Sequence, residues 1–421
     1  MQYYGPPGIA LYFLQLLDRV GGQGPNPALY AAAQRAGDRI VVTLDDALAA
    51  FGSNTALYYG SAGLAFALRE LAARTPVPAL HAAAEFLASA RHVEDSVLAA
   101  ASAVGTNGTT WSNNTDIAHG ASGTGLYLLH AATAETDQAH AAKMTAAAVA
   151  AGEWLLTMAV PTPGGGLKWP RGKDSDGGHD GVFYPNFCCG TAGVAYFLAT
   201  LHQATSDPRF LEAAVRGGDF LLSVANRTTG LLIFHDEPAH ESMYYLGWCH
   251  GPAGTSRLWV RLYQVTGDAK YWELVLDGAT SIACEAVPAF RWLLDTPEPT
   301  VAWANAGQCC GGAAALNFLL QITAYASQRG LPTRDLDTLK VATKLADNLA
   351  RRAVPCGAPK VNGTCFRSPE EHGTPSVLTT QVGWMQGAAG IAASLVHYDA
   401  VAVAKSTAGT RFNWPDEPWT T

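Results

Sequence analysis

A short glycine motif recurs seven times along the chain, and an apolar run of helical length follows each copy. The motif GSAG at 60–63 precedes LAFALREL, and GTAG at 190–193 precedes VAYFLATLH. The first glycines stand at 5, 60, 120, 190, 251, 311 and 387. One such motif would mean little, but seven at regular spacing are typical of a repeat architecture.

The segments between the motifs predict the architecture. The run after each motif is apolar on nearly every side, as in a buried helix. Amphipathic, alanine-rich stretches lie between the motifs, at 27–44, 79–101, 137–158, 208–225, 267–286 and 334–352. We therefore expect an all-α fold, an α/α toroid (barrel) of seven inner helices with an outer helical ring. Motif glycines would let backbones approach closely and permit positive φ in the entering loops.

Length and composition favour one large domain. Of the 421 residues, 48% are hydrophobic and 15% are charged, so a large core can form. We expect residues 1–421 to form a single domain. Six outer stretches serve seven inner helices, so we expect a seventh outer helix upstream of Met1. The sequence PDEP at 415–418 looks like a tail.

The charge of the chain excludes two classes of partner. A formal net charge of −8 argues against nucleic acid and against an anionic membrane surface. No apolar run reaches the roughly 18 residues of a spanning helix. The N-terminus also lacks the basic region of a signal peptide. We expect a cytoplasmic protein with neither nucleic acid nor membrane as a partner.

Eight cysteines are present, and four of them form two adjacent pairs, Cys188-Cys189 and Cys309-Cys310. Adjacent pairs suit a disulfide framework poorly, and they indicate metal binding or reactive thiols instead. Cys356 and Cys365 flank a loop and could bond under oxidising conditions, although we expect a reduced pair. We expect Cys284 to lie in the core.

Three cysteines lie just before glycine motifs in neighbouring repeats. Cys249 precedes the fifth motif, and Cys309 and Cys310 precede the sixth. The repeat places all three on adjacent loops at one end of the ring. Zinc favours thiolate and imidazole ligands, and a catalytic zinc keeps three protein ligands and one open position. We predict Zn²⁺ bound by these three residues; the alternative is three small buried residues at helix starts.

The motifs Trp248-Cys249-His250-Gly251 and Cys309-Cys310-Gly311 resemble those of the lanthionine synthetase C-like (LanC-like) cyclases. The resemblance extends from Tyr3 to Phe412. In that family a W-C-x-G cysteine and a C-H-G pair bind zinc, so Cys310 here replaces a histidine. Some members resemble this chain in having three cysteines at that site.

The resemblance implies an activity and partners. A zinc-bound cysteine thiolate of a dehydrated precursor peptide adds to dehydroalanine or dehydrobutyrine, and the enolate is then protonated. The product is lanthionine or methyllanthionine, which makes the protein a thioether-forming cyclase. A dehydratase is the implied partner.

The acid and base residues depart from the family pattern. Asp116 matches the family's aspartate before the third motif, although a helix N-cap is an alternative role. Cys189 stands where the family has a histidine, and a thiol moves protons near pH 7 less readily. Tyr245 replaces an arginine of bacterial cyclases. His119 and His250, beside the motifs, are the candidates to take over proton transfer.

Other residues near the loops keep more than one interpretation. His179 and His372 lie in loops before the fourth and seventh motifs, where solvent-exposed or structural roles are the alternative. The pair Cys188-Cys189 could line the cavity, bind or exchange a thiol, or simply pack. Trp248 and Trp384 could contact a peptide or wall the cavity from beneath.

Three other functions stay open. The W-C-H-G form suggests an enzyme that adds glutathione or another thiol to dehydroamino acids. Cys189 and Tyr245 suggest a peptide-binding homologue that keeps zinc but has lost its proton donor. A six-fold α/α barrel, such as a glycosidase or prenyltransferase subunit, is disfavoured by seven motifs and by the lack of paired carboxylates on the loops.

Overall fold

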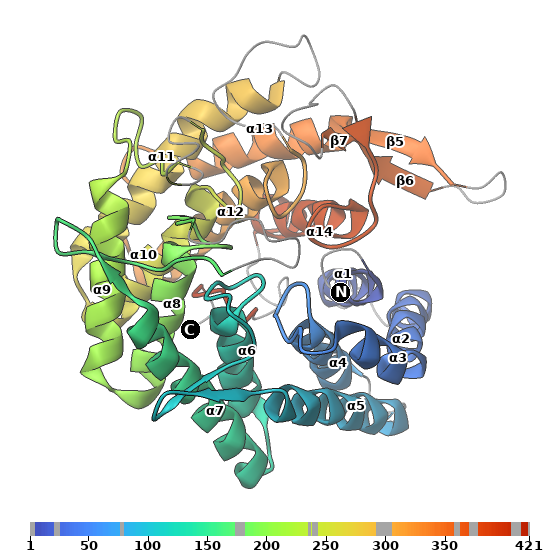
Figure 1. The fold of residues 1–421 in the computed structure, drawn as a ribbon. Helices are drawn as coiled ribbons and strands as arrows, with labels where there is room; N and C mark the ends of the chain where they lie inside the picture. Colours follow the sequence, from blue (N-terminus) through green and yellow to red (C-terminus); the bar gives the residue numbers. More distant parts are fainter. Residues whose placement is uncertain are drawn as a thin grey trace.

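The computed structural model describes residues 5–20, 26–75, 80–172, 182–234, 237, 243–291, 305–357, 363–369, 378–405 and 414–419. In this part of the chain, seven inner helices form a closed ring, each packed on the next and α14 packed on α1 (Figure 1). They are α1 (Pro6–Val20), α4 (Ser61–Arg74), α6 (Ala121–Ala134), α8 (Thr191–Thr205), α10 (Pro252–Thr266), α12 (Gly312–Arg329) and α14 (Ala388–Tyr398). The predicted toroid is confirmed, and seven inner helices exclude the six-fold barrel.

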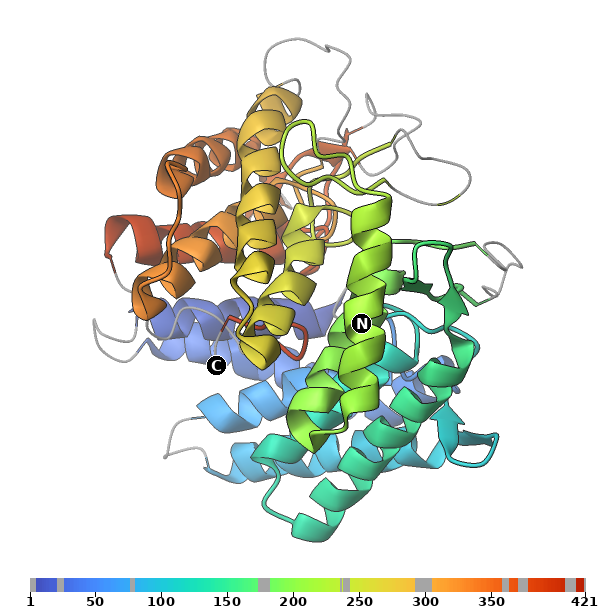
Figure 2. The same ribbon diagram turned by 90° about the vertical axis from the view of Figure 1, so that its left-hand side faces the viewer.

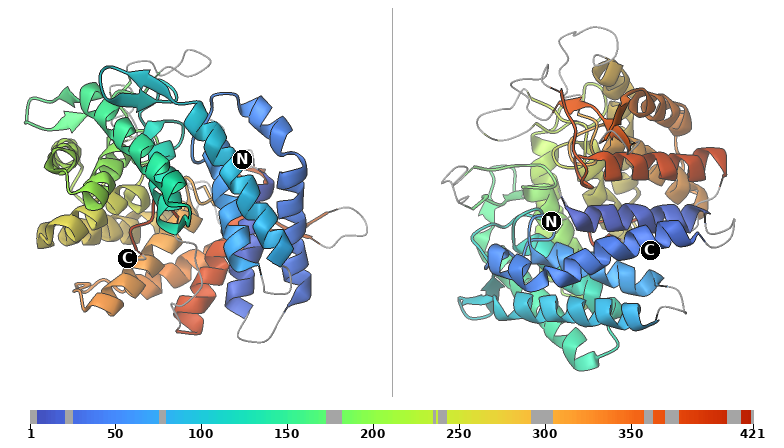
Figure 3. Two further views of the ribbon diagram at one scale, coloured as in Figure 1. Left: turned by 90° about the horizontal axis from the view of Figure 1, so that it is seen from below. Right: turned by 90° about the vertical axis from the view of Figure 1, so that its right-hand side faces the viewer.

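An outer helix follows each of the first six inner helices and packs on it (Figures 2 and 3). The outer helices are α2 (Pro27–Val42), α5 (Leu80–Ala99), α7 (Gln138–Met158), α9 (Pro208–Ser223), α11 (Ala269–Arg291) and α13 (Thr338–Arg351). A short helix, α3 (Leu44–Phe51), continues from α2. Because α2 already covers α1, the inner helix with no following outer helix among the described residues is α14. The outer helix expected upstream of Met1 stays a prediction.

The two kinds of helix begin differently. Outer helices α7, α9 and α13 begin after Asp137, Asp207 and Asp337, whose carboxylates accept hydrogen bonds from backbone N–H groups of the first turn. Inner helices α4, α6, α8, α10, α12 and α14 begin after a motif glycine with no side-chain cap. Small residues at these starts leave room for neighbouring backbone.

The motif glycines serve close approach rather than positive φ. Gly190 has a φ of −151°, and Gly120 has a φ of −125°, so the expectation of positive φ is wrong. A Cβ on Gly190 would lie 1.7 Å from the carbonyl oxygen of Tyr184, and one on Gly254 would lie 1.8 Å from that of Trp248. Each entering loop therefore folds back against its own helix start, where only glycine fits.

Among the described residues, four antiparallel strand pairs lie in the segments between helices. They pair β1 (Ser102–Val104) with β2 (Gly108–Thr110), β3 (Val160–Pro161) with β4 (Leu167–Lys168), β5 (Ala353–Cys356) with β6 (Gly363–Phe366), and β7 (Ser368–Pro369) with β8 (Leu378–Thr379). Cys356 and Cys365 form a disulfide across β5 and β6 with their Cα atoms 5.8 Å apart, so the expected reduced pair is wrong. Cys356 pairs with Gly363 and Cys365 pairs with Val354 in this ladder, so the two cysteines lie diagonally across the strand pair. Cys284 is exposed on α11 and not in the core.

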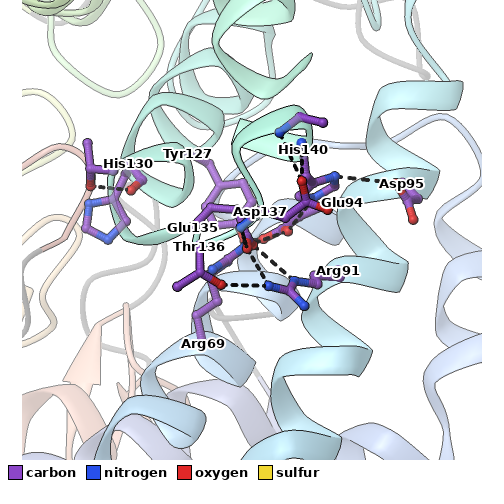
Figure 4. A network of polar contacts seen from close by, with 12 residues as sticks. Arg69, Arg91, Glu94, Asp95, Tyr127, His130, Glu135, Thr136, Asp137 and His140 are labelled. Carbon is purple, nitrogen blue, oxygen red and sulfur yellow. Dashed lines mark hydrogen bonds and ion pairs between the residues drawn. The ribbon is translucent and has the colours of Figure 1, made fainter. Parts of the chain in front are cut away.

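A buried polar network ties the ring together near the C-terminal end of α6 (Figure 4). Glu94 of α5 accepts from Arg69 of α4 at 2.6 Å, from Tyr127 of α6 at 2.5 Å and from His140 of α7 at 3.0 Å. Glu135, which ends α6, pairs with Arg69 at 2.6 Å. The network joins two inner helices to two outer ones with the buried carboxylates paired, as burial of charge requires.

The last described segment, residues 414–419, lies inside the ring rather than forming a tail (Figure 1). The Trp414 ring stands 4.7 Å from that of Phe66 on α4, and the Trp419 ring stands 6.0 Å from that of Phe318 on α12. Both tryptophans are buried. A π-helical turn, η3 (Asp399–Val403), ends the helical part of the chain. None of the described helices is long and apolar enough to cross a membrane.

Gly190→Ala tests the close-approach role of the motif glycine. The new methyl group would meet the Tyr184 carbonyl, so we expect the free energy of unfolding to fall by about 3 kcal/mol or more. Gly164→Ala is the matched control, because nothing lies within 4 Å of its Cβ position. Chemical denaturation of both variants checks this, and equal stability would contradict the role.

Candidate metal centre

The loops that enter the inner helices are joined by backbone hydrogen bonds at one equivalent position. The N–H of Ala118 donates to the carbonyl of Cys188 at 2.9 Å, and the N–H of Cys188 donates to that of Cys249 at 3.0 Å. The N–H of Cys249 donates to Cys309 at 2.9 Å, and the N–H of Cys309 donates to Met385 at 2.8 Å. Loops of five repeats thus form a ladder that fixes the side chains of these residues relative to one another.

This ladder brings Cys249, Cys309 and Cys310 together, as the repeat predicted. Their sulfur atoms all lie within 4.8 Å of one another, with 3.1 Å between the Sγ atoms of Cys249 and Cys310. The residues are 1%, 4% and 8% exposed. Three buried sulfurs from two loops could hold a metal ion. A tetrahedral zinc with Zn–S bonds of about 2.3 Å sets its sulfurs roughly 3.8 Å apart, so small side-chain movements suffice.

The surroundings of the three sulfurs favour a cation. Burial, together with hydrogen bonds from neighbouring thiols, raises the pKa of Cys249 well above its ordinary value. A metal ion that replaces the thiol protons removes this penalty. Cys310 also directly precedes Gly311, the N-cap of α12, and a helix N-terminus favours negative charge.

A second group, Asp116, His119 and Cys189, faces the same end of the ring. Their ligand atoms lie within 4.8 Å of one another. Asp116 is completely buried; its Oδ1 accepts from the backbone N–H of His119 at 2.6 Å and lies 3.6 Å from Nδ1 of that ring. The residue that caps α6 is Gly120, so Asp116 is not the helix N-cap.

The electrostatics of this group keep His119 protonated. Burial lowers the pKa of His119, but the charge of the nearby Asp116 carboxylate and the neighbouring Cys189 outweigh it and raise the pKa to about 10. Burial raises the pKa of Asp116, while His119 and Arg171 hold it below its ordinary value. The Tyr59 ring stacks on the imidazole with 4.4 Å between ring centroids. His119 is therefore an imidazolium at neutral pH that can donate a proton.

His250 lies apart from the three-cysteine group. Its ring atoms come within 4.8 Å of the sulfurs of Cys188 and Cys189, and its ring packs 5.4 Å from that of Tyr245. The sequence candidates His179 and His372 both lie outside the described residues.

The two tryptophans wall the site from beneath. Trp248 is 3% exposed, and its Nε1 donates to the carboxylate of Asp416 at 2.8 Å. Tyr58 donates to the same carboxylate at 2.9 Å, and Arg257 forms an ion pair with it at 3.2 Å. Trp384 is buried and packs 5.3 Å from the Trp414 ring. The burial of both indoles favours the interpretation that they wall the cavity, while contact with a peptide stays a prediction.

Sequence reasoning missed two residues of this site. Arg171, which comes from the loop before the fourth motif, lies with its Nε 3.6 Å from Asp116 Oδ2. Asp416 anchors the tryptophan next to Cys249 from the far end of the chain. Neither residue belongs to a repeated motif; only the acidic and aromatic character of the last residues was a signal for Asp416.

A comparison of the sequence with protein families identifies the family of this chain. The profile described as "Lanthionine synthetase C-like protein" matches residues 1–405. The chain belongs to this family. A sequence comparison with curated proteins finds no match.

Solved structures similar to this LanC-like protein show the fold. Nisin cyclase superposes with a TM-score of 0.60 at 16% identity, over 99% of this chain and 91% of that one. A GH76 α-mannanase from Bacteroides thetaiotaomicron superposes with a TM-score of 0.46 at 14% identity, over 82% of this chain and 83% of that one, which is too low to carry an argument.

Asp116→Asn tests the origin of the His119 pKa. Without the carboxylate, burial dominates, and we expect the pKa to fall from about 10 to below about 6.5. In the parent, the stability from this pair is complete below about pH 6.5 and is lost as the pH rises through about 10. Titration by NMR of labelled histidine measures both pKa values.

Asp347→Asn, on the exposed face of α13, is the control and leaves the His119 titration unchanged. A His119 signal that titrates near pH 6.5 in the parent protein would contradict the assignment.

Proposed function

We propose that this protein is a zinc-dependent cyclase that forms thioether bonds in a peptide. The observation that carries the proposal is the convergence of Cys249, Cys309 and Cys310 at the loop end of a LanC-like toroid. The substrate is a precursor peptide with a free cysteine and a dehydroalanine or dehydrobutyrine residue. The products are lanthionine and methyllanthionine.

The three cysteines would hold zinc as thiolates and leave a fourth position for the substrate. Zinc held there lowers the pKa of a substrate thiol, so that the thiolate is available near neutral pH. Cys249 is oriented from beneath, because Trp248 is fixed by its hydrogen bond to Asp416. The ring of buried aromatic side chains around Asp416 keeps water away from the underside of the site.

We assign the proton donor to His119. The substrate thiolate attacks the β-carbon of the dehydroamino acid, and the α-carbon must then receive a proton. The imidazolium of His119 supplies it, and the proton released by the substrate thiol restores the imidazolium. The contact between His119 and Cys189 supports this assignment, because the imidazole that the fourth loop lacks comes from the third loop instead.

One partner enzyme follows from this chemistry. Dehydroamino acids arise when serine or threonine loses water, so a dehydratase must act on the peptide first. The substrate cysteine must also be a free thiol when it reacts.

One assay tests the proposal and separates it from its alternatives. The zinc-loaded protein is incubated with a dehydrated, cysteine-containing peptide, and remaining thiols are then alkylated and counted by mass spectrometry. We expect loss of free thiol without a change in peptide mass before alkylation. His119→Asn should lower the rate about 100-fold or more. The control His92→Asn, on the exposed face of α5, should not change it.

A parallel reaction pairs a dehydroalanine peptide with glutathione. Consumption of glutathione with no peptide cyclisation would favour the thiol-adding enzyme. Binding of the peptide without thiol consumption in either reaction would favour the peptide-binding homologue. Both results contradict the proposed cyclase.

Two variants distinguish the loss of a metal ligand from a change of ligand type. They are Cys309→Ala, which removes a ligand, and Cys310→His, which replaces one. Removal of a sulfur ligand should lower the zinc content by one ion per chain and abolish cyclisation. Cys310→His restores the family's imidazole, so it should retain the metal and measurable activity. Elemental analysis of purified variants checks both, and an unchanged zinc content in Cys309→Ala would contradict the ligand assignment.

A further inference from the structure

The fourth and sixth loops carry the same sequence in the same register. Cys188-Cys189-Gly190 precedes α8, and Cys309-Cys310-Gly311 precedes α12. The fifth loop, between them, offers Cys249 and then His250. Because the backbone ladder keeps the three loops in register, Cys249 meets the cysteine pair on one side while His250 meets the pair on the other.

This arrangement makes a second group of soft ligands. The sulfurs of Cys188 and Cys189 and a ring nitrogen of His250 lie within 4.8 Å of one another, with 2.7 Å between the two sulfurs. The cysteines are 5% and 7% exposed, and His250 is partly buried. Cys188 also interacts with Cys249, so this group adjoins the group of Cys249, Cys309 and Cys310.

We propose that Cys188, Cys189 and His250 bind a second zinc ion beside the first. Two thiolates and an imidazole are ligands that zinc prefers, with one further position left for water or another thiol. A tetrahedral ion would move the two sulfurs to roughly 3.8 Å apart, which needs only side-chain rotation. Binding releases the two thiol protons to the solvent. The site does not depend on the proposed cyclase activity.

Contacts between the loops couple the two groups. The backbone carbonyl of Cys249 accepts from the N–H groups of Phe187 at 3.1 Å and Cys188 at 3.0 Å. The two ions would therefore be held by one rigid unit of backbone. Cys189 would then serve as a metal ligand in this protein, and the proton donor would be His119 with Asp116.

Another candidate group of metal ligands does not carry the same inference. Glu94, Glu135 and His140 also converge, but Arg69 and Arg91 already pair with the carboxylates. Those guanidinium groups already neutralise the two carboxylates, so they take the place that a metal ion would have.

Metal content and Co²⁺ spectroscopy test the proposal. The full-length protein is reduced, loaded with Zn²⁺ and freed of excess metal, and its zinc is counted by elemental analysis. We expect two ions per chain in the parent, and one in Cys189→Ser and in His250→Gln. Cys310→Ser should lose the other ion independently, and the double variant Cys189→Ser/Cys310→Ser should lose both. Cys284→Ser, an exposed cysteine on α11, is the matched control and should keep two.

Co²⁺ loading supplies a readout that a folding defect does not imitate. Thiolate-to-Co²⁺ absorption should reach its plateau at two equivalents in the parent and at one in Cys189→Ser. A plateau at one equivalent in both proteins would overturn the second site. A Cys188–Cys189 disulfide that persists after reduction, seen as a peptide mass two units lower, would overturn it as well. The proposed cyclase fails separately, if the Cys310 group holds zinc and the peptide still does not cyclise.

Discussion

The structure depends on the close approach of loop backbones at one end of the toroid, which the described residues show for the loops of repeats two to seven. Glycine stands directly before six of the seven inner helices at positions where a Cβ would collide with backbone atoms of the entering loop, as at Gly190 and Gly311. The loops can then join through backbone hydrogen bonds from Ala118 to Met385. These bonds set the relative positions of the cysteines and histidines before any metal or substrate binds. The close packing of the loop backbones that closes the ring therefore also holds the site rigid.

In this site, a histidine of one loop takes the place of a histidine that the neighbouring loop lacks. The family's histidine is absent from the fourth loop, but the third loop turns His119 toward the same place and holds it with Asp116. A buried carboxylate raises the pKa of the imidazole, and Arg171 keeps that carboxylate ionised. The role of proton donor that we propose for His119 thus has a physical basis, because burial alone would lower the pKa of its imidazole.

Sequence predicted the features that repeat and missed those that do not. The seven motifs predicted the toroid, and the equivalent positions of Cys249, Cys309 and Cys310 predicted their convergence, because a repeat converts sequence register into position in space. The role of residues 414–419 was missed, since insertion into the ring is a long-range packing event with no periodic signal. The Cys356–Cys365 disulfide was missed because it depends on the pairing of β5 and β6. The side chain of His119 lies beside the buried carboxylate of Asp116, three residues earlier, and beside Cys189 of the next loop.

The most direct measurement of the central claim is X-ray diffraction from zinc-loaded crystals, recorded on both sides of the zinc absorption edge. The account predicts an anomalous peak at about 2.3 Å from the sulfurs of Cys249, Cys309 and Cys310, with a fourth position open toward the loop end of the ring. Zinc bound elsewhere, with these three sulfurs free of metal, would contradict the account.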